Sequence, residues 1–174
     1  MSMQLRPLGS GEEQEALAAH SELLRDDFDF LLDLNPEIGW DQYLQILADQ
    51  AQGINLRADR VPATFLVAAV DNRIVGRVSI RHYLNEYLAG TGGGHIGYAV
   101  RPEFRRQGMA TQILKHSLDI AAEVGIRRAL LTCDAENVIS RKVIEKNGGI
   151  YENSAVHPSD SQLKHRFWIP TIRI

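Results

Sequence analysis

The chain has 174 residues, of which 44% are hydrophobic and 24% are charged, and its formal net charge is −3. This balance is ordinary for a globular protein, and no segment approaches the ~20 apolar residues of a membrane-spanning helix, so no membrane partner is expected. Residues 11–60 hold twelve Asp or Glu against three Lys or Arg. We therefore expect no nucleic acid partner for this segment. Its acids either solvate helix faces or form an acidic wall towards a cationic substrate.

Cysteine usage and the N-terminal residues indicate the compartment. Cys133 is the only cysteine, so no intrachain disulfide can form, and a reducing compartment fits. Residues 1–8 do not have the pattern of a signal peptide. A cytoplasmic protein is expected. No repeat or linker divides the chain, so a single domain over residues 1–174 is also expected.

The first third of the chain is predicted to be mainly helical. Residues 3–8 read as a short strand. Residues 11–25 suggest a helix, because they carry apolar residues among acids, namely Ala16, Leu17, Leu23 and Leu24. A second helix is expected over residues 40–51, where apolar residues recur at helical spacing, namely Trp40, Tyr43, Leu44 and Leu47.

The pattern then changes to strands. Residues 64–70 predict one strand and residues 74–82 a second, with a turn between them. Alternation within the second strand places four residues on one face, namely Ile74, Val78, Ile80 and His82. A loop follows and ends in three consecutive glycines, 92–94.

The next three elements are expected to form a right-handed crossover. Residues 95–100 predict a strand that stops at Pro102, which has no backbone donor. Residues 108–124 keep helical periodicity, and residues 128–133 predict a buried strand. The two strands of such a unit normally run parallel in one sheet.

The remaining residues predict a short helix and two more strands. The helix is expected over residues 138–147, with Asn137 as its N-cap. Strands are expected near residues 149–153 and 165–169.

The segment VRPEFRRQGMATQIL, residues 100–114, has the properties of an anion site. A basic turn follows a strand, and a helix begins at a glycine. The first turn of a helix leaves about four N–H groups without partners, with the positive end of the helix dipole behind them. Gly108 lets the backbone approach a phosphate group, and Arg105 and Arg106 add positive charge. A diphosphate fits this arrangement.

Two other phosphate motifs are disfavoured. A P-loop requires Gly-Lys-Ser/Thr, which does not follow Gly108. Gly92-x-Gly94-x-x-Gly97 matches the dinucleotide pattern letter for letter, but that pattern follows a strand and opens a helix, whereas this one enters a strand. These glycines are expected to shape the turn into the strand.

The motif Arg105-x-x-Gly108-x-Ala110 after a strand resembles the acetyl-CoA signature of the GNAT superfamily of N-acetyltransferases. The resemblance covers roughly residues 64–153 and extends through Asn137 to Lys146-Asn147-Gly148. The stretches IRHYLN and GGHIGYAVRP further resemble a group of predicted bacterial acetyltransferases without a settled substrate.

The resemblance implies an α/β (α+β) fold: a mixed, mostly antiparallel sheet with a central parallel β-α-β unit, splayed strands, and helices on both faces. Residues 64–153 would form the acetyl-CoA-binding core, and residues 11–60 a helical segment on the acceptor side. The strand would bind pantetheine through its backbone, the helix start would hold the pyrophosphate, and the last helix would flank the thioester. The implied cofactor-binding residues are Tyr98, Ala99, Val100, Arg105, Arg106, Gln107, Gly108, Met109, Ala110, Thr111, Asn137 and Ser140.

Two positions depart from the family pattern. Many relatives have a tyrosine seven residues after the asparagine, where it protonates the departing thiolate, and this chain has Ile144. The loss is tolerable because a thiol of pKa about 8.5 leaves readily as thiolate. Gly149 replaces the usual aromatic residue after the helix.

An amine acceptor must lose a proton before it attacks a thioester, so a base or a water relay is expected. His95, at the start of the cofactor strand, is either this base or a structural residue that caps the strand. His82 either orients the substrate or assists His95, or it is a buried histidine bonded to a backbone carbonyl. Glu86 and Asp134 are reserve bases. Cys133 follows two leucines in a buried strand, so packing is the favoured interpretation of it.

The leading hypothesis is therefore acetyl transfer from acetyl-CoA to a primary amine of a small molecule, by direct attack in a ternary complex. The alternatives are acetylation of a protein lysine or N-terminus, and a non-catalytic acyl-CoA sensor. No metal is expected, because the histidines lack ligand spacing. The resemblance also allows a homodimer, since similar proteins are commonly dimers.

Overall fold

The structure is a computed structural model that describes residues 2–172. Its strands form two antiparallel sheets, one with the order β1-β2-β3-β4 and one with the order β5-β7-β6. The strands of the first sheet are β1 (Gln4–Arg6), β2 (Ala63–Val70), β3 (Arg73–Arg81) and β4 (Ile96–Val100). Those of the second are β5 (Arg128–Asp134), β6 (Ile150–Val156) and β7 (Leu163–Pro170).

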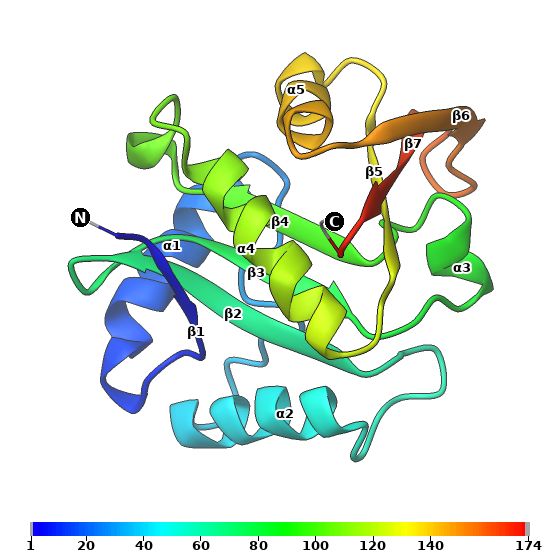
Figure 1. Ribbon diagram of the computed structural model, residues 1–174. Helices are drawn as coiled ribbons and strands as arrows, with labels where there is room; N and C mark the ends of the chain where they lie inside the picture. The colour runs from blue at the N-terminus through cyan, green and yellow to red at the C-terminus, as the bar shows by residue number, and fades with distance from the viewer. Residues whose placement is uncertain (1, 173–174) are drawn as a thin grey trace.

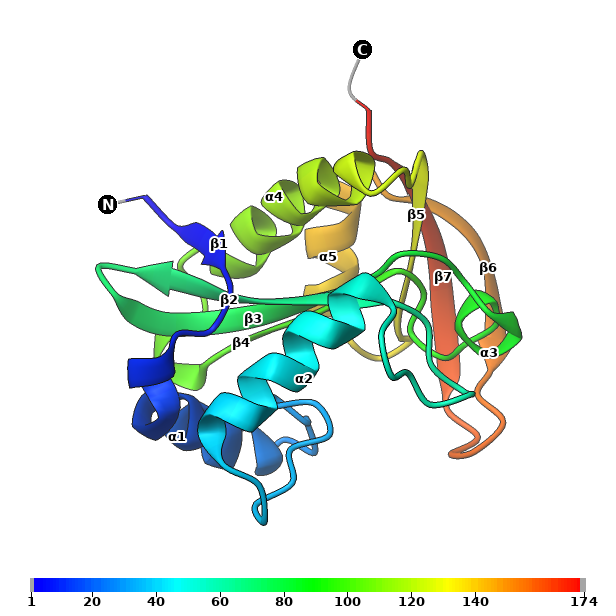
Figure 2. The same cartoon turned by 90° about the horizontal axis from the view of Figure 1, so that it is seen from below.

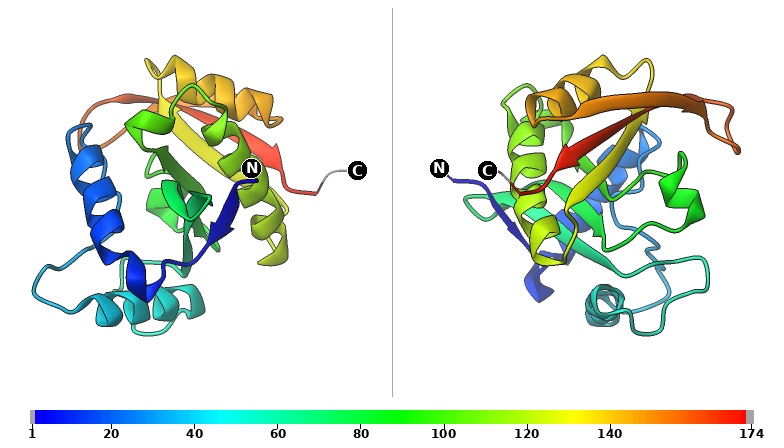
Figure 3. Two further views of the ribbon diagram at one scale, coloured as in Figure 1. Left: turned by 90° about the vertical axis from the view of Figure 1, so that its left-hand side faces the viewer. Right: turned by 45° about the vertical axis from the view of Figure 1, so that its right-hand side comes forward.

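Helices cover both faces of the first sheet, as expected (Figures 1 and 2). Helices α1 (Glu13–Leu24) and α2 (Trp40–Gln52) lie against one face, and α4 (Met109–Glu123) lies against the other. Helix α5 (Val138–Lys146) packs on α4 and β5. The short helix α3 (Glu86–Ala89) lies beside the second sheet (Figure 3), and two 3-10 turns precede α1 and α4, at Ser10–Glu12 and Pro102–Phe104. In residues 2–172, no helix is both long and apolar enough to cross a membrane.

Two hydrophobic clusters lie on opposite faces of the first sheet. One packs β3 against α4 and extends to β5 and β7, and the other packs it against α1 and α2. We call the two clusters the α4 cluster and the α1–α2 cluster. Val78 and Ile80 lie on one face of β3, as expected, and belong to the α4 cluster. The prediction that Ile74 shares this face is wrong, because Ile74 belongs to the α1–α2 cluster. The reason is a β-bulge: β3 has one extra residue, Val75, between its pairings with Ala68 and Ala69. An extra residue reverses the alternation of side chains beyond it.

Strands β4 and β5, which α4 joins, separate from each other. Their β-bridge is a single pairing of Gly94 with Leu131, followed by a hydrogen bond of 2.8 Å from the His95 N–H to the Leu130 carbonyl oxygen. The parallel pairing expected from the β-α-β order does not form, since every ladder in the described part of the chain is antiparallel. Instead the His95 side chain occupies the next position between the strands, and the strands splay.

The glycines before β4 shape its turn, as expected. Gly93 and Gly94 have φ angles of 109° and 63°. A Cβ atom on Gly94 would lie 2.2 Å from the Leu130 carbonyl oxygen, so that no other residue fits at the splay point. Gly97 lies inside β4, which removes the dinucleotide-binding interpretation.

Candidate active site

One edge of β4 has backbone groups that the sheet does not use. The Arg81 N–H donates to the His95 carbonyl oxygen at 2.7 Å, and the Arg101 N–H donates to the Val75 carbonyl oxygen at 2.9 Å. In an antiparallel pair, alternate residues bond to the neighbouring strand. The backbone groups of Tyr98 and Val100 therefore point away from β3, towards the gap between β4 and β5, while Ala99 packs against the α1–α2 cluster.

The turn after β4 leads into the N-terminus of α4. Arg106 and Gly108 have positive φ angles of 61° and 78°, and Gly108 is the N-cap. The N–H groups of Met109, Ala110 and Thr111 have no helical partner at this end. The first turn of α4 contains no acidic residue, and an added Cβ on Gly108 would meet nothing within 4 Å. The open space, the free donors and the positive dipole end fit a phosphate group.

Two of the predicted side chains of this turn, those of Arg105 and Gln107, form hydrogen bonds within the protein. Arg105 donates through Nε to the Val100 carbonyl oxygen at 3.1 Å and through Nη2 to Asp26 at 2.6 Å, so it holds the turn against β4. Gln107 donates to the Glu103 carbonyl oxygen. Arg106 is exposed and forms no ion pair within residues 2–172. Arg106 is thus the cation of the motif that is free for an anion.

Three predicted residues meet across the gap between β4 and α5. The Asn137 side chain caps α5 by accepting the Ser140 N–H at 3.0 Å. The Ser140 Oγ lies 3.1 Å from the Tyr98 hydroxyl oxygen. Burial raises the pKa of Tyr98 to about 12, so the hydroxyl stays protonated at neutral pH. A hydroxyl pair therefore joins the splayed strand to the last helix.

Ile144 and Gly149, the two residues that depart from the family pattern, pack against each other. Ile144 is 1% exposed and belongs to the core. A Cβ on Gly149 would lie 2.4 Å from the Ile144 Cγ2 atom and 2.8 Å from its carbonyl oxygen, so Ile144 excludes an aromatic residue there. Cys133 is buried in the α4 cluster, and burial raises the pKa of its thiol, which confirms the packing interpretation.

His95 has a structural environment. It is 7% exposed, its Nδ1 atom accepts the Leu130 N–H at 2.9 Å, and its ring packs edge-on against Trp168. Burial, followed by the charge of Arg81, lowers the pKa of His95 to about 4. The ring is therefore neutral, with its hydrogen on Nε2 and its lone pair on Nδ1 already used. These contacts favour the structural alternative over a general base.

Two of the other candidate bases, His82 and Asp134, are also engaged. The His82 Nε2 atom lies 2.8 Å from Thr64 Oγ1, and burial lowers the pKa of His82. Asp134 forms an ion pair with Lys164. No hydrogen bond joins His82 to His95 in the described chain.

A cavity of about 790 Å³ lies on the α1–α2 side of the sheet. We call it the α3 cavity, because α3 forms one wall, and the others come from β2, β3 and the segments on either side of α2. Its charged lining residues are Asp33, Asp59, Arg60, Arg81 and Glu86. Of the predicted bases, the cavity contains Glu86 and neither histidine. Sequence reasoning missed Arg81, although its alternation with Ser79 and Arg77 on β3 placed all three on one face.

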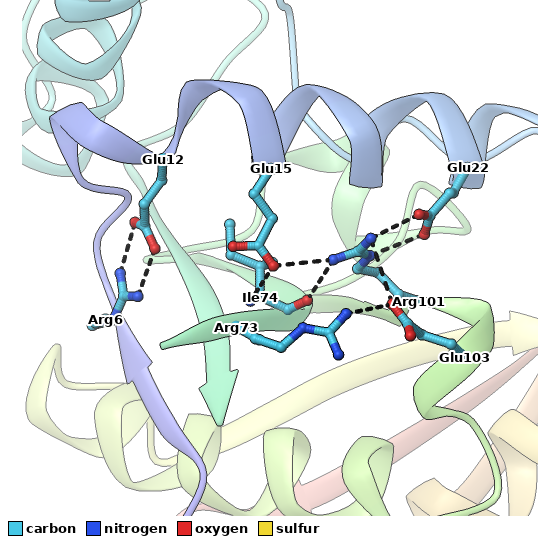
Figure 4. A network of polar contacts seen from close by, with 8 residues as sticks. All are labelled: Arg6, Glu12, Glu15, Glu22, Arg73, Ile74, Arg101 and Glu103. Carbon is cyan, nitrogen blue, oxygen red and sulfur yellow. Dashed lines mark hydrogen bonds and ion pairs between the residues drawn. The ribbon is translucent and has the colours of Figure 1, made fainter. Parts of the chain in front are cut away.

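Six of the twelve acids in residues 11–60 form ion pairs with arginine. Figure 4 shows the largest group, in which Arg101 donates to Glu22 at 2.7 and 2.9 Å, to Glu15 at 3.3 Å and to the Ile74 carbonyl oxygen at 2.9 Å. Asp33 and Asp59 line the α3 cavity but are paired with Arg60 and Arg57. The paired acids hold α1 to Arg101 and the loop residues to one another, and the two acids of this segment that line the cavity are both paired with arginine.

Comparison with known proteins gives the class. The chain belongs to the acetyltransferase (GNAT) family, whose model matches residues 21–149. A search of curated sequences gives no significant match. The chain is an N-acetyltransferase that takes its acetyl group from acetyl-CoA.

Solved structures share the fold at low identity. A spermidine N-acetyltransferase chimera built from a Vibrio cholerae protein is 16% identical over 98% of this chain and 96% of its own, with a TM-score of 0.66. A Salmonella typhimurium acetyltransferase solved with acetyl-CoA is 13% identical over 100% and 96%, with a TM-score of 0.63. Mycobacterium smegmatis RimJ, solved with a CoA disulfide, is 20% identical over 97% and 81%, with a TM-score of 0.68. In residues 2–172, no group of three or more His, Cys, Asp or Glu side chains is arranged to hold a metal ion.

Proposed function

We propose that this N-acetyltransferase acetylates the primary amine of a small molecule by direct attack in a ternary complex. The α3 cavity, of about 790 Å³, carries this proposal. Small-molecule sites typically measure about 300–1,000 Å³ and are walled on several sides. A protein lysine or N-terminus as acceptor would need an open groove. The spermidine N-acetyltransferase among the structural neighbours offers a precedent for a small amine.

The proposed cofactor site uses the free edge of β4 and the start of α4. When bound, acetyl-CoA supplies the thioester carbonyl that the amine attacks. The backbone groups of Tyr98 and Val100 bind the pantetheine arm, and the free N–H groups of Met109 to Thr111, with Arg106, bind the pyrophosphate. The same edge supplies the Tyr98 N–H as a donor for negative charge that develops on an oxygen during acyl transfer.

The proposed base is Glu86. An alkylammonium group has a pKa near ~10 and must be deprotonated before attack. Glu86 lines the α3 cavity, and its carboxylate forms no ion pair within the described residues. It receives the proton directly or through a water molecule. His95 positions β4 against β5 and stays neutral.

The test is steady-state release of free CoA with a panel of small amines and, separately, a lysine-containing peptide. We expect turnover with at least one small amine and none above background with the peptide. Turnover of the peptide alone would show that the acceptor is a protein and not a small molecule. Tight acetyl-CoA binding without CoA release for either class would indicate a non-catalytic sensor.

A further inference from the structure

Arg81 is a cation without a partner inside the α3 cavity. Its side chain lines the cavity, and its Nη1 atom is shielded from solvent without a hydrogen-bond partner in residues 2–172. The three acids of the cavity lie too far away to form an ion pair with it, although two of them pair with other arginines. A buried guanidinium donor without an acceptor is costly, so an acceptor oxygen that enters the cavity and reaches Arg81 would relieve this cost.

Arg77, on the same face of β3, shows what a structural arginine looks like in this fold. It donates to the Gly97 carbonyl oxygen at 3.3 Å and to the Asp29 carbonyl oxygen at 2.8 Å, and it stacks on the Phe28 ring at 4.5 Å. The Arg77 Nε atom is also shielded without a partner, but both Nη atoms of Arg77 donate. The Arg81 side chain forms no hydrogen bond or ion pair with any residue of 2–172. The difference between the two arginines indicates a ligand-directed role for Arg81.

Two glycines make room for the Arg81 guanidinium. A Cβ on Gly97 would lie 3.1 Å from Arg81 Nη1, and one on Gly93 would lie 3.6 Å from it. Gly97 belongs to the pattern that resembles a dinucleotide motif, and its use here is steric. The absence of side chains at these two positions lets the guanidinium approach the backbone at the start of β4. Burial, followed by the charge of Arg60, lowers the pKa of Arg81, and an adjacent anion would oppose that shift.

The cavity also holds a charge of the opposite sign without a partner. Glu86 lines the same space and forms no ion pair within the described chain. One unpaired cation and one unpaired anion match a ligand that carries both an ammonium and a single negative charge. A guanidinium presents paired N–H donors that fit the two oxygens of a carboxylate. A phosphate dianion would need a second cation, and Arg60 is already paired with Asp33.

Building on the proposed function, we infer that the acceptor is a small amino carboxylate, such as an amino acid, whose carboxylate binds the Arg81 guanidinium while its amine faces Glu86. The carboxylate fixes the orientation of the substrate, and the amine is the group that is acetylated. An amine that lacks the carboxylate leaves the Arg81 donor unpaired and is discriminated against for that reason.

The experiment uses the full chain and a panel of free amino acids, each compared with its carboxamide, which keeps the amine and removes the negative charge. CoA release gives kcat/KM, and isothermal titration in the presence of CoA gives binding without chemistry. We expect at least one amino acid to exceed its carboxamide at least tenfold in both measurements. Arg81→Gln removes this ratio, and Arg81→Lys restores it in part, because lysine keeps the charge without the paired donors. Arg60→Gln removes a paired cation from the same cavity and keeps the ratio.

The outcomes separate the inference from the proposed function. Turnover of amines with equal values for acid and carboxamide overturns the inference and leaves the small-amine function in place. Binding of an amino acid in preference to its carboxamide, without CoA release, supports the Arg81 site and overturns the proposed function. A ratio that survives in Arg81→Gln overturns the inference even if the substrate is an amino acid. Unchanged acetyl-CoA affinity in each variant shows that it is folded.

Discussion

His95 and Leu130 exchange two hydrogen bonds across the point where β4 and β5 separate. The His95 N–H donates to the Leu130 carbonyl oxygen at 2.8 Å, and the Leu130 N–H donates to the His95 Nδ1 atom at 2.9 Å. A side-chain nitrogen thus takes the place of the carbonyl that would continue the pairing. The strands are held together at one end and open at the other, where the backbone of β4 is free.

The first prediction concerns this side-chain acceptor. His95→Ala leaves the buried Leu130 N–H without a partner, which costs about 1–3 kcal/mol of unfolding free energy. His95→Asn offers an amide oxygen in place of Nδ1 and loses less. Urea denaturation monitored by circular dichroism compares the two. Both variants would lose kcat by about 10²–10⁴ if His95 were the base, so an Asn variant with at least a tenth of wild-type kcat excludes that role.

The second prediction concerns the pH dependence of stability. The pKa of His95 is about 4 in the folded chain and about 6.5 in an unfolded one. The unfolded state therefore binds more protons between these values. The stability from the neutral ring is complete above about pH 6.5 and is lost as pH falls through 4. Urea midpoints at pH 7.5 and 5.0 should fall more in the wild type than in His95→Asn, and equal falls would show that His95 titrates normally.

The sequence predicted the helices, strands and caps better than the pairing of strands and the contacts between distant side chains. Local signals such as the Gly108 helix start and the Asn137 cap are set by neighbouring residues, and the structure has both. The position of Ile74 was wrong because a bulge at Val75 depends on pairing with another strand. Arg81 was missed because an unpaired charge is visible only when all surrounding partners are placed. The role of His95 depends on its hydrogen bond with Leu130, which lies 35 residues away in the sequence, so local sequence patterns could not decide between a base and a structural residue.

The third prediction concerns the start of α4. Gly108→Glu brings a carboxylate to the open space beside the free N–H groups, where it repels the diphosphate, so acetyl-CoA binding should weaken at least 100-fold by isothermal titration. Gly125→Glu is the matched control. Gly125 also has a positive φ angle, 89°, and nothing within 4 Å of an added Cβ, but it follows the other end of α4. If acetyl-CoA binding weakened equally in both variants, the cause would be backbone strain and not the carboxylate at the start of α4.

The fourth prediction concerns the base. Glu86→Gln keeps the size of the side chain and removes its ability to accept a proton, so kcat should fall by roughly 10²–10⁴ while the affinity for acetyl-CoA is unchanged. The loss should shrink as pH rises, because more of the amine is then already deprotonated. Asp134→Asn is the control, since that carboxylate is paired with Lys164. If the Asp134 variant lost kcat and the Glu86 variant did not, the two roles would be exchanged.

The last prediction concerns the attachment of α1 to the sheet. Arg101→Met removes the donor to Glu15, Glu22 and the Ile74 carbonyl oxygen at once. Its side chain is 6% exposed, whereas the two carboxylates keep 31% and 33% of their exposure, so water compensates in part. We expect a loss of about 2–3 kcal/mol, below the usual cost of breaking a fully buried pair. Arg105→Gln breaks an exposed pair with Asp26 and the hydrogen bond to the Val100 carbonyl oxygen, and should cost about 0.5–2 kcal/mol.

Arg101 also lowers the pKa of Glu22, so the contribution of this ion pair is complete above the normal carboxyl pKa and is lost as pH falls through the lowered pKa. Urea unfolding at pH 7 and pH 4 should therefore separate wild type from Arg101→Met more widely at pH 7, and a constant difference would mean that the carboxylates contribute little and packing dominates.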